Sequence, residues 1–207
     1  MTLPGVAWAE SALVVVDMQN DFVRVGAPME VPTARAVVPV IDRLAATFRS
    51  RGRPVIFTRF IAGPRRTLMW EWTDAHRHPV CCCWRRHPRY YSELDAERFC
   101  ADVVDELAPR PEDYVVDKYG YDAFHNTPLQ DILAAEGCRA IVVTGAVTQI
   151  CVDSTVRGAV HRGVACLVCR DAVASPRADL HSTSLAVLNH KFAWVADSRD
   201  ILDRLER

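Results

Sequence analysis

The stretch that decides the fold is residues 12–22, which read ALVVVDMQNDF. Five apolar residues, 12–16, run without interruption into Asp17. A short continuous apolar run that ends at a polar turn is typical of a parallel strand buried on both faces. Because ligands bind at the carboxyl ends of the strands in open α/β sheets, Asp17 is a candidate functional residue.

The same kind of run recurs along the chain, with helical patterns between the repeats, which indicates an α/β fold. The six predicted strands are 12–16, 55–58, 114–116, 140–144, 165–168 and 193–196. The predicted helices are 34–51, 128–137, 150–162, 96–107, 181–189 and 198–205. Glycines follow several of these helices, as expected at helix ends. No internal repeat or linker divides the chain, so we expect one domain over residues 1–207.

The composition is that of a soluble globular protein. Half of the 207 residues are hydrophobic, a quarter are charged, and the formal net charge is −1. This balance gives no indication of nucleic acid or a membrane as partner, and no stretch approaches the roughly 20 apolar residues of a membrane span. We therefore expect a cytoplasmic protein. Of the eight cysteines, Cys138, Cys166 and Cys169 lie in or beside strand-like runs and are interpreted as small core residues.

Residues 59–94 lack clear periodicity and are rich in aromatic, cysteine and histidine side chains. Loops of this length usually cover a site or form an interface, so we interpret the segment as a lid or a subunit contact. Its aromatic residues are suited either to stacking on a planar substrate or to packing the loop. The pattern does not decide between these two roles.

Two further strand ends carry reactive side chains. Lys118 follows strand 114–116, and residues 145–150 lead from strand 140–144 to Cys151 at the start of a helix. The unpaired amides and the dipole of a helix N-terminus are expected to lower the pKa of that thiol. Together Cys151, Asp17 and Lys118 offer a nucleophile, a base and a cation at one edge of the sheet.

These residues resemble the motifs of the isochorismatase-like cysteine hydrolases. The resemblance lies in residues 14–22, in Lys118 with residues 122–124, and in residues 144–152. It extends over nearly the whole chain and is weakest from 59 to 98.

The resemblance implies a three-layer α/β/α fold with a six-stranded parallel sheet in the order 3-2-1-4-5-6. Asp17 and Cys151 would face each other between strands 1 and 4. Lys118 would start roughly 10 Å away, two strand spacings from strand 1, and would have to reach inward. A cis peptide between Ala146 and Val147 would aim the amides of Val147 and Cys151 at an oxyanion.

The implied reaction is cleavage of a C–N bond in a small amide, ureido or N-carbamoyl substrate. Asp17 would deprotonate Cys151, and a thioester would form with release of ammonia or an amine. No cofactor is expected, and relatives of this kind suggest a homo-oligomer, a dimer or a tetramer. The residues expected to bind substrate are Gln19, Phe22, Thr148 and Arg59, the last together with Arg65 or Arg66.

The sequence also raises the question of a metal site. Nicotinamidases carry an Asp-x-His metal motif after strand 2, whereas Thr58, Arg59 and Phe60 stand here, so no metal is expected. Zinc ligands are also conceivable, but their spacing is poor because adjacent cysteines rarely point at one metal. This set comprises His76, His78, Cys81, Cys82, Cys83 and His87.

Three alternative functions compete with this reaction. One is a non-catalytic small-molecule binding or assembly protein, and another is an aspartate-dependent vinyl-ether hydrolase, which Cys151 disfavours. Nucleotide binding is disfavoured because no glycine-rich phosphate loop follows a strand. His181 is interpreted as a capping or core histidine, since Asp17 already supplies the base.

Overall fold

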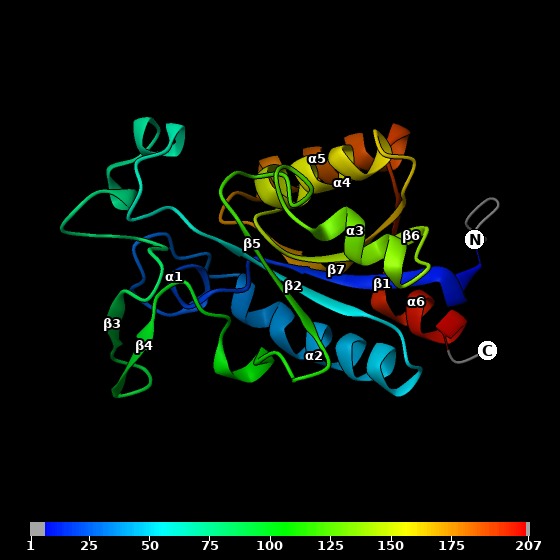
Figure 1. Cartoon of the computed structure of the whole chain (residues 1–207), viewed down its shortest axis with the longest axis horizontal. Coiled ribbons are helices and arrows are strands. Elements are labelled where there is room, and N and C mark those ends of the chain that lie inside the picture. Colours follow the sequence, from blue (N-terminus) through cyan, green and yellow to red (C-terminus); the bar gives the residue numbers. More distant parts are fainter. Residues whose placement is uncertain (1–6, 206–207) are drawn as a thin grey trace.

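A computed structural model describes residues 7–205 of the chain. Its centre is a six-stranded sheet in the order β5-β2-β1-β6-β7-β8, in which every neighbouring pair is parallel (Figure 1). The predicted order 3-2-1-4-5-6 is therefore confirmed. The strands are β1 (Ser11–Val16), β2 (Val55–Phe60), β5 (Tyr114–Lys118), β6 (Ala140–Ala146), β7 (Ala165–Ala174) and β8 (Trp194–Ala196).

Helices cover both faces of the sheet, which gives the predicted three layers. Figure 1 shows α2 and α6 on one face and α3, α4 and α5 on the other. The helices are α1 (Asn20–Val23), α2 (Ala34–Ser50), α3 (Leu129–Ala135), α4 (Asp153–Val160), α5 (Ala178–Lys191) and α6 (Ser198–Leu205). Among residues 7–205, no helix is long and apolar enough to cross a membrane.

Burial on both faces explains the continuous apolar runs. Every residue of β1 and of β6 is buried, because helices pack above and below these central strands. On one side, α2 turns Val37, Ile41, Leu44 and Phe48 toward the sheet at helical spacing. The predicted core cysteines Cys138, Cys166 and Cys169 are buried as well, and all eight cysteines of the chain are unpaired.

The predicted helix 96–107 is wrong. Residues 96–99 form strand β4 (Ala96–Phe99), which pairs antiparallel with β3 (Pro88–Tyr91), and only Asp105–Leu107 forms a short 3-10 helix. The backbone amides of Asn20 and Asp21 donate to the carbonyls of Asp102 and Cys100, which holds the chain extended after β4. These tertiary backbone hydrogen bonds override the local helix propensity.

The segment predicted as an irregular loop, 59–94, contains short ordered elements. β2 runs to Phe60, and two 3-10 helices and β3 follow. The rings of Trp70 and Trp84 are stacked with centroids 5.7 Å apart, and their indole N–H groups donate to the carbonyls of Ala62 and His76. These two tryptophans therefore pack the segment onto itself.

Candidate active site

Asp17 lies directly after β1, at the carboxyl edge of the sheet, with a left-handed backbone (φ 50°) and no exposed surface. Its Oδ1 accepts a 2.6 Å hydrogen bond from the Thr58 hydroxyl, and its own amide donates to the Thr58 carbonyl. Left-handed backbone is uncommon for a residue with a side chain and is concentrated at functional sites. Thr58 was not predicted as a site residue; the one signal was a hydroxyl within the buried run of β2.

Lys118 reaches Asp17 from the end of β5, two strands away. Its Nζ lies 2.7 Å from Oδ2 of Asp17 and donates to the Gly120 carbonyl at 3.0 Å. Both charged side chains are fully buried. Burial opposes the charged form of the lysine, but attraction to Asp17 and to Cys151 outweighs it, so the pKa of Lys118 is raised. The lysine is therefore an ammonium in the folded protein.

Gly145 brings the end of β6 close to β1. It has a positive φ of 103°, and a Cβ atom at this position would lie 2.0 Å from the Val16 carbonyl oxygen. Only glycine fits this approach. The chain that leads to Cys151 therefore passes against the residue that precedes Asp17.

Cys151 lies in a π-helical turn, Thr148–Val152, between β6 and α4. The peptide bond between Ala146 and Val147 before this turn is cis, at the position where the resemblance implies one. The thiol is buried, and its pKa responds to both Asp17 and Lys118, so the sulfur lies beside these two charged groups. Sulfur, carboxylate and ammonium thus meet in one place.

The pKa of the thiol differs from the expectation. Burial raises the pKa of Cys151 to about 12, with Lys118 lowering it and Asp17 raising it. The expectation that the helix N-terminus would favour a resting thiolate is therefore wrong, because desolvation of the charged sulfur dominates. The resting residue is a thiol, and it needs a base before it can attack.

The segment after Lys118 is held against α4. The Thr155 hydroxyl accepts from the amide of Ala123, and Asp122 caps the amide of Phe124 at 2.8 Å. A Cβ atom on Gly158 would lie 2.4 Å from the Asp122 carboxylate, so the glycine makes room for it. Residues 122–124 therefore have a structural explanation, which is to fix the turn behind the lysine.

Two predicted substrate-binding residues use their side chains within the protein. Gln19 donates to the carbonyls of Phe60 and Ala101, and its Oε1 accepts from the amide of Phe60. The Thr148 hydroxyl donates to the Ala174 carbonyl and lies 2.9 Å from Nδ1 of His181. In this structure Gln19 joins the start of the 59–94 segment to β1, and Thr148 joins the π-helical turn to α5.

The other two predicted substrate-binding residues, Arg59 and Phe22, also contact groups within the protein. Arg59 pairs with Asp117 at 2.8 Å and with Asp102 at 2.6 Å, so its guanidinium already faces two carboxylates. Phe22 is buried in the apolar cluster on the α2 side of the sheet, whereas Cys151 belongs to the cluster on the opposite side. A substrate-binding role for Arg59 and Phe22 stays a prediction.

Two positions in the predicted elements require revision. His181 is the fourth residue of α5, which begins at Ala178, so it does not open the helix. Burial lowers the pKa of His181, consistent with a neutral ring beside Thr148. The helix expected from residue 150 begins as a π-helical turn and becomes α4 only at Asp153.

Two aromatic residues near the thiol were not predicted at this position. The pKa of Tyr121 is raised by burial and by the nearby Cys151 sulfur, and its ring lies 6.2 Å from that of Phe60. The Phe60 ring in turn lies 5.3 Å from Nζ of Lys118. No sequence signal distinguishes Tyr121 from the other tyrosines, because its position depends on the turn after β5.

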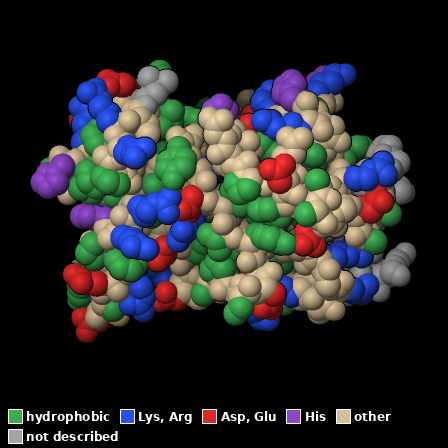
Figure 2. All heavy atoms as spheres, in the orientation of Figure 1, with side chains coloured by type: hydrophobic (Ala, Val, Ile, Leu, Met, Phe, Trp, Pro, Cys, Tyr) green, Lys and Arg blue, Asp and Glu red, His purple; other side chains and the backbone are tan. Residues whose placement is uncertain are grey.

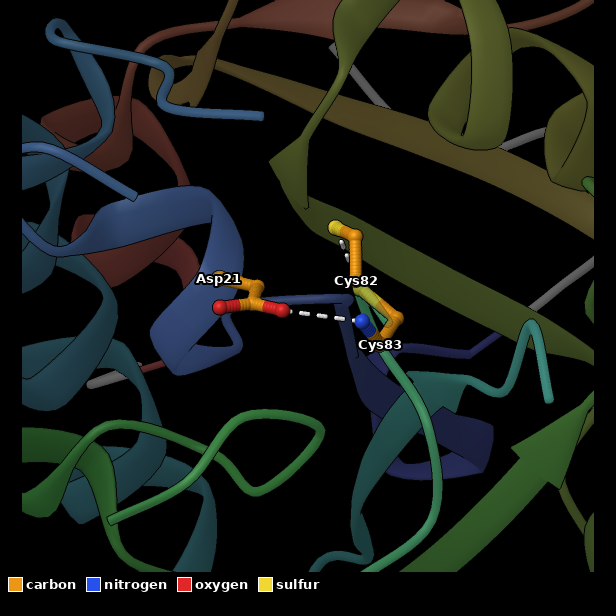
Figure 3. A group of neighbouring side chains, drawn as sticks. All are labelled: Asp21, Cys82 and Cys83. Atoms are coloured by element: carbon orange, nitrogen blue, oxygen red, sulfur yellow. Dashed lines mark hydrogen bonds between the residues drawn. The ribbon is translucent and has the colours of Figure 1, made fainter. Parts of the chain in front are cut away.

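Asp21, Cys82 and Cys83 form a buried group whose potential ligand atoms lie within 4.8 Å of one another (Figure 3). The two sulfurs are 3.7 Å apart. The Asp21 carboxylate, however, accepts from Arg89 Nε at 2.7 Å, the Tyr91 hydroxyl at 2.8 Å and the Cys83 amide at 2.9 Å. These donors occupy the carboxylate, so the group is well explained as an anchor that ties residues 82–91 to α1.

Comparison with known proteins agrees with the fold. Residues 11–200 match the isochorismatase domain family. A ureidoacrylate amidohydrolase RutB from Methylobacterium radiotolerans is 33% identical over 204 residues, covering 91% of this chain and 77% of that protein. One from Pseudomonas savastanoi pv. phaseolicola is 31% identical over 205 residues, covering 92% and 82%.

Solved structures are similar over almost the whole chain. A cysteine hydrolase from Pseudomonas syringae pv. phaseolicola superposes with a TM-score of 0.84 at 27% identity, covering 100% of this chain and 99% of that one. An N-carbamoylsarcosine amidase from Thermoplasma acidophilum gives 0.74 at 29% identity, covering 91% and 96%. The chain belongs to the isochorismatase family. It is a hydrolase, and the names of its relatives support amidohydrolase activity in general.

Proposed function

We propose that this chain hydrolyses a C–N bond of a small amide, ureido or N-carbamoyl substrate through a thioester on Cys151. Asp17 serves as general base and acid, and the ammonium of Lys118 balances the negative charge of the site. The observation that carries the proposal is the buried contact of Lys118 with Asp17 at 2.7 Å, with the Cys151 thiol interacting with both groups. Relatives named for ureidoacrylate and N-carbamoylsarcosine support this substrate range.

The first half of the reaction forms the thioester. Because the pKa of Cys151 is about 12, Asp17 takes the thiol proton as sulfur attacks the carbonyl carbon. The amides of Val147 and Cys151 are proposed to stabilise the resulting oxyanion. When the C–N bond breaks, the proton on Asp17 passes to the departing nitrogen, and ammonia or an amine leaves.

The second half regenerates the enzyme. Water attacks the thioester carbon while Asp17 accepts a proton from it, and the C–S bond breaks. The sulfur recovers a proton from Asp17, so the thiol and the carboxylate are restored. Lys118 keeps its proton throughout, because its raised pKa makes the ammonium the stable form near neutral pH.

An ammonia-release screen over small amides, ureas and N-carbamoyl amino acids tests the proposal, with Cys151→Ala as the matched control. We expect turnover of at least one compound by the wild type and its loss in the variant. Release of ammonia by Cys151→Ala at the wild-type rate would contradict the thioester route. Cleavage of a vinyl ether instead of any amide would favour the aspartate-dependent alternative, and no turnover with intact ligand binding would favour a binding protein.

A further inference from the structure

Two side chains of α5 contact the two ends of the π-helical turn that carries Cys151, residues 148–152, which we call the nucleophile turn. At its start, Nδ1 of His181 lies 2.9 Å from the Thr148 hydroxyl oxygen. Directly after its end, the Ser184 hydroxyl donates to the Asp153 carboxylate at 2.7 Å. Positions 181 and 184 are three residues apart, so they lie on the same face of the helix. One face of α5 therefore holds the turn on both sides of the thiol.

The direction of the hydrogen bond to His181 follows from the other contact of Thr148. The Thr148 hydroxyl donates to the Ala174 carbonyl at 3.0 Å, and a hydroxyl group has only one proton to donate. Its oxygen can therefore only accept from His181, so Nδ1 of the ring carries a hydrogen. Burial lowers the pKa of His181, which leaves the ring neutral near neutral pH with its single proton on Nδ1.

Both partners of Thr148 belong to fixed parts of the fold. Ala174 ends β7 and is the strand partner of Ala146 in β6, and α5 packs Leu185 and Leu188 into the core. The Thr148 side chain itself is fully buried. A buried hydroxyl that loses a partner has no bulk water to replace it, so the contact with α5 matters for the conformation of the turn.

We propose that His181 is a positioning residue that acts through Thr148 on the nucleophile turn. Thr148 lies in the chain between Val147 and Cys151, whose amides are assigned to the oxyanion under the proposed function, and the inference rests on that function. A shift of the Thr148 side chain moves both amides relative to the substrate. His181 exchanges no proton with the substrate, so Asp17 keeps its role as general base.

Three single variants and a control test this role. His181→Ala removes the donor, whereas His181→Asn keeps an N–H group close to the position of Nδ1. Thr148→Val removes the acceptor and keeps the branched shape of the side chain. His190→Ala is the matched control, since it makes the same substitution at an exposed position near the other end of α5. Figure 2 shows histidine side chains at the surface over the layer where Figure 1 places α4 and α5.

The first readout is the steady-state kinetics of a compound found in the ammonia-release screen. In His181→Ala we expect kcat to fall about tenfold with KM changed by less than about twofold, because a small displacement of the reacting groups slows chemistry more than binding. His181→Asn should recover most of kcat, and His190→Ala should match the wild type. Equal losses in His181→Ala and His181→Asn would show that the N–H donor is unimportant and would overturn the inference.

A double variant tests whether the histidine acts through the hydroxyl. His181→Ala/Thr148→Val should be no slower than Thr148→Val alone, since the second substitution removes a donor that no longer has an acceptor. Losses that multiply in the double variant would show that the two residues act independently and would contradict the proposed route.

Alkylation of Cys151 by iodoacetamide gives a second readout that needs no substrate. The thiolate displaces iodide from the reagent, so the rate constant reports the thiolate fraction and the access to the sulfur. A loosened turn admits water to the sulfur, so we expect His181→Ala to react about fivefold faster, the change that one ordinary hydrogen bond would give. His181→Asn and His190→Ala should react at the wild-type rate. All rates are measured well below the unfolding temperature of each variant, so that global unfolding does not contribute.

The two readouts separate this inference from the proposed function. Faster alkylation of His181→Ala that His181→Asn reverses, without turnover of any compound by the wild type, would support the positioning role and count against the amidohydrolase proposal. Wild-type kcat and wild-type alkylation in His181→Ala would overturn the positioning role and leave the amidohydrolase proposal standing.

Discussion

The reactivity of Cys151 depends on two neighbours that act in opposite directions. Asp17 raises the pKa of the Cys151 thiol and Lys118 lowers it, while burial sets the overall value at about 12. Because Asp17 and Lys118 pair with each other, neither charge is left unbalanced when the thiol is neutral. Removing the charge of Asp17 should therefore lower the pKa of the Cys151 thiol and, at the same time, reduce turnover.

Asp17→Asn separates these two effects. Without the carboxylate, only Lys118 acts on the sulfur, so we expect the pKa of Cys151 to fall and iodoacetamide to alkylate it faster at pH 8 than in the wild type. Hydrolysis should fall by a factor of about 10² to 10⁴, the usual contribution of a general acid–base residue. Alkylation rates by mass spectrometry and ammonia release measure the two outcomes; slower alkylation together with retained turnover would contradict the assignment of Asp17.

Lys118→Met tests the buried ion pair through stability. It leaves Asp17 charged and without its cationic partner, so we expect the free energy of unfolding to fall by about 3–5 kcal/mol. Asp17→Asn/Lys118→Met should recover much of that loss, which a double-mutant cycle by urea unfolding measures. Additive losses in the double variant would show that the pair is not coupled.

The same pair gives stability a defined pH dependence. The pKa of Lys118 is raised in the folded state, so its contribution is fully present below the unfolded lysine value of about 10.4 and is lost as pH rises further. The unfolding free energy of the wild type should therefore drop more steeply above this pH than that of Asp17→Asn/Lys118→Met.

At the scale of elements, the site depends on how closely β6 approaches β1. Gly145→Ala would place a methyl group 2.0 Å from the Val16 carbonyl oxygen, so the two strand ends must move apart. We expect a loss of more than about 2 kcal/mol and a loss of turnover, because Cys151 would move relative to Asp17.

Gly52→Ala is the matched control for this prediction. Gly52 also has a positive φ, 63°, but nothing lies within 4 Å of a Cβ atom there. Its substitution should cost only the backbone strain, about 1 kcal/mol, and leave turnover unchanged. Thermal unfolding and ammonia release of the two variants test this difference. Equal losses of stability and of turnover would show that the approach of β6 to β1 is unimportant.

The elements that the sequence predicts best are the fully buried ones, because burial on both faces requires a continuous run of apolar residues. β1 and β6 are buried along their whole length, so their apolar runs and the polar residues that end them could be recognised directly. The helix expected at 96–107 failed because the pairing of β3 with β4 depends on partners that local propensity does not reveal.

The same distinction applies to the residues of the candidate site. Asp17, Lys118 and Cys151 could be placed at one edge, since each follows a predicted strand or begins a predicted helix. Thr58 and Tyr121 were missed, because their contacts depend on strand register and on a turn. The side chain of Gln19 donates hydrogen bonds to the backbone carbonyls of Phe60 and Ala101, which lie far away in the sequence.

At the scale of the whole molecule, the segment after β2 exposes large apolar side chains. Trp72 is 73% exposed, Tyr90 57% and Phe99 46%. Side chains of this kind are enriched at protein interfaces, and we predict that the chain forms a homo-oligomer through this end. Trp72→Glu should reduce the sedimentation coefficient, whereas Leu180→Glu on α5 should not; a monomeric wild type would contradict the prediction.

The most direct measurement of the central claim is the mass of the enzyme quenched with acid during turnover of a compound found in the screen. We predict an adduct of the acyl or carbamoyl group on the peptide that contains Cys151, which disappears when the substrate is exhausted and never forms in Cys151→Ala. Turnover by the wild type with no adduct on Cys151 under rapid quenching, and with equal turnover by Cys151→Ala, would contradict the account.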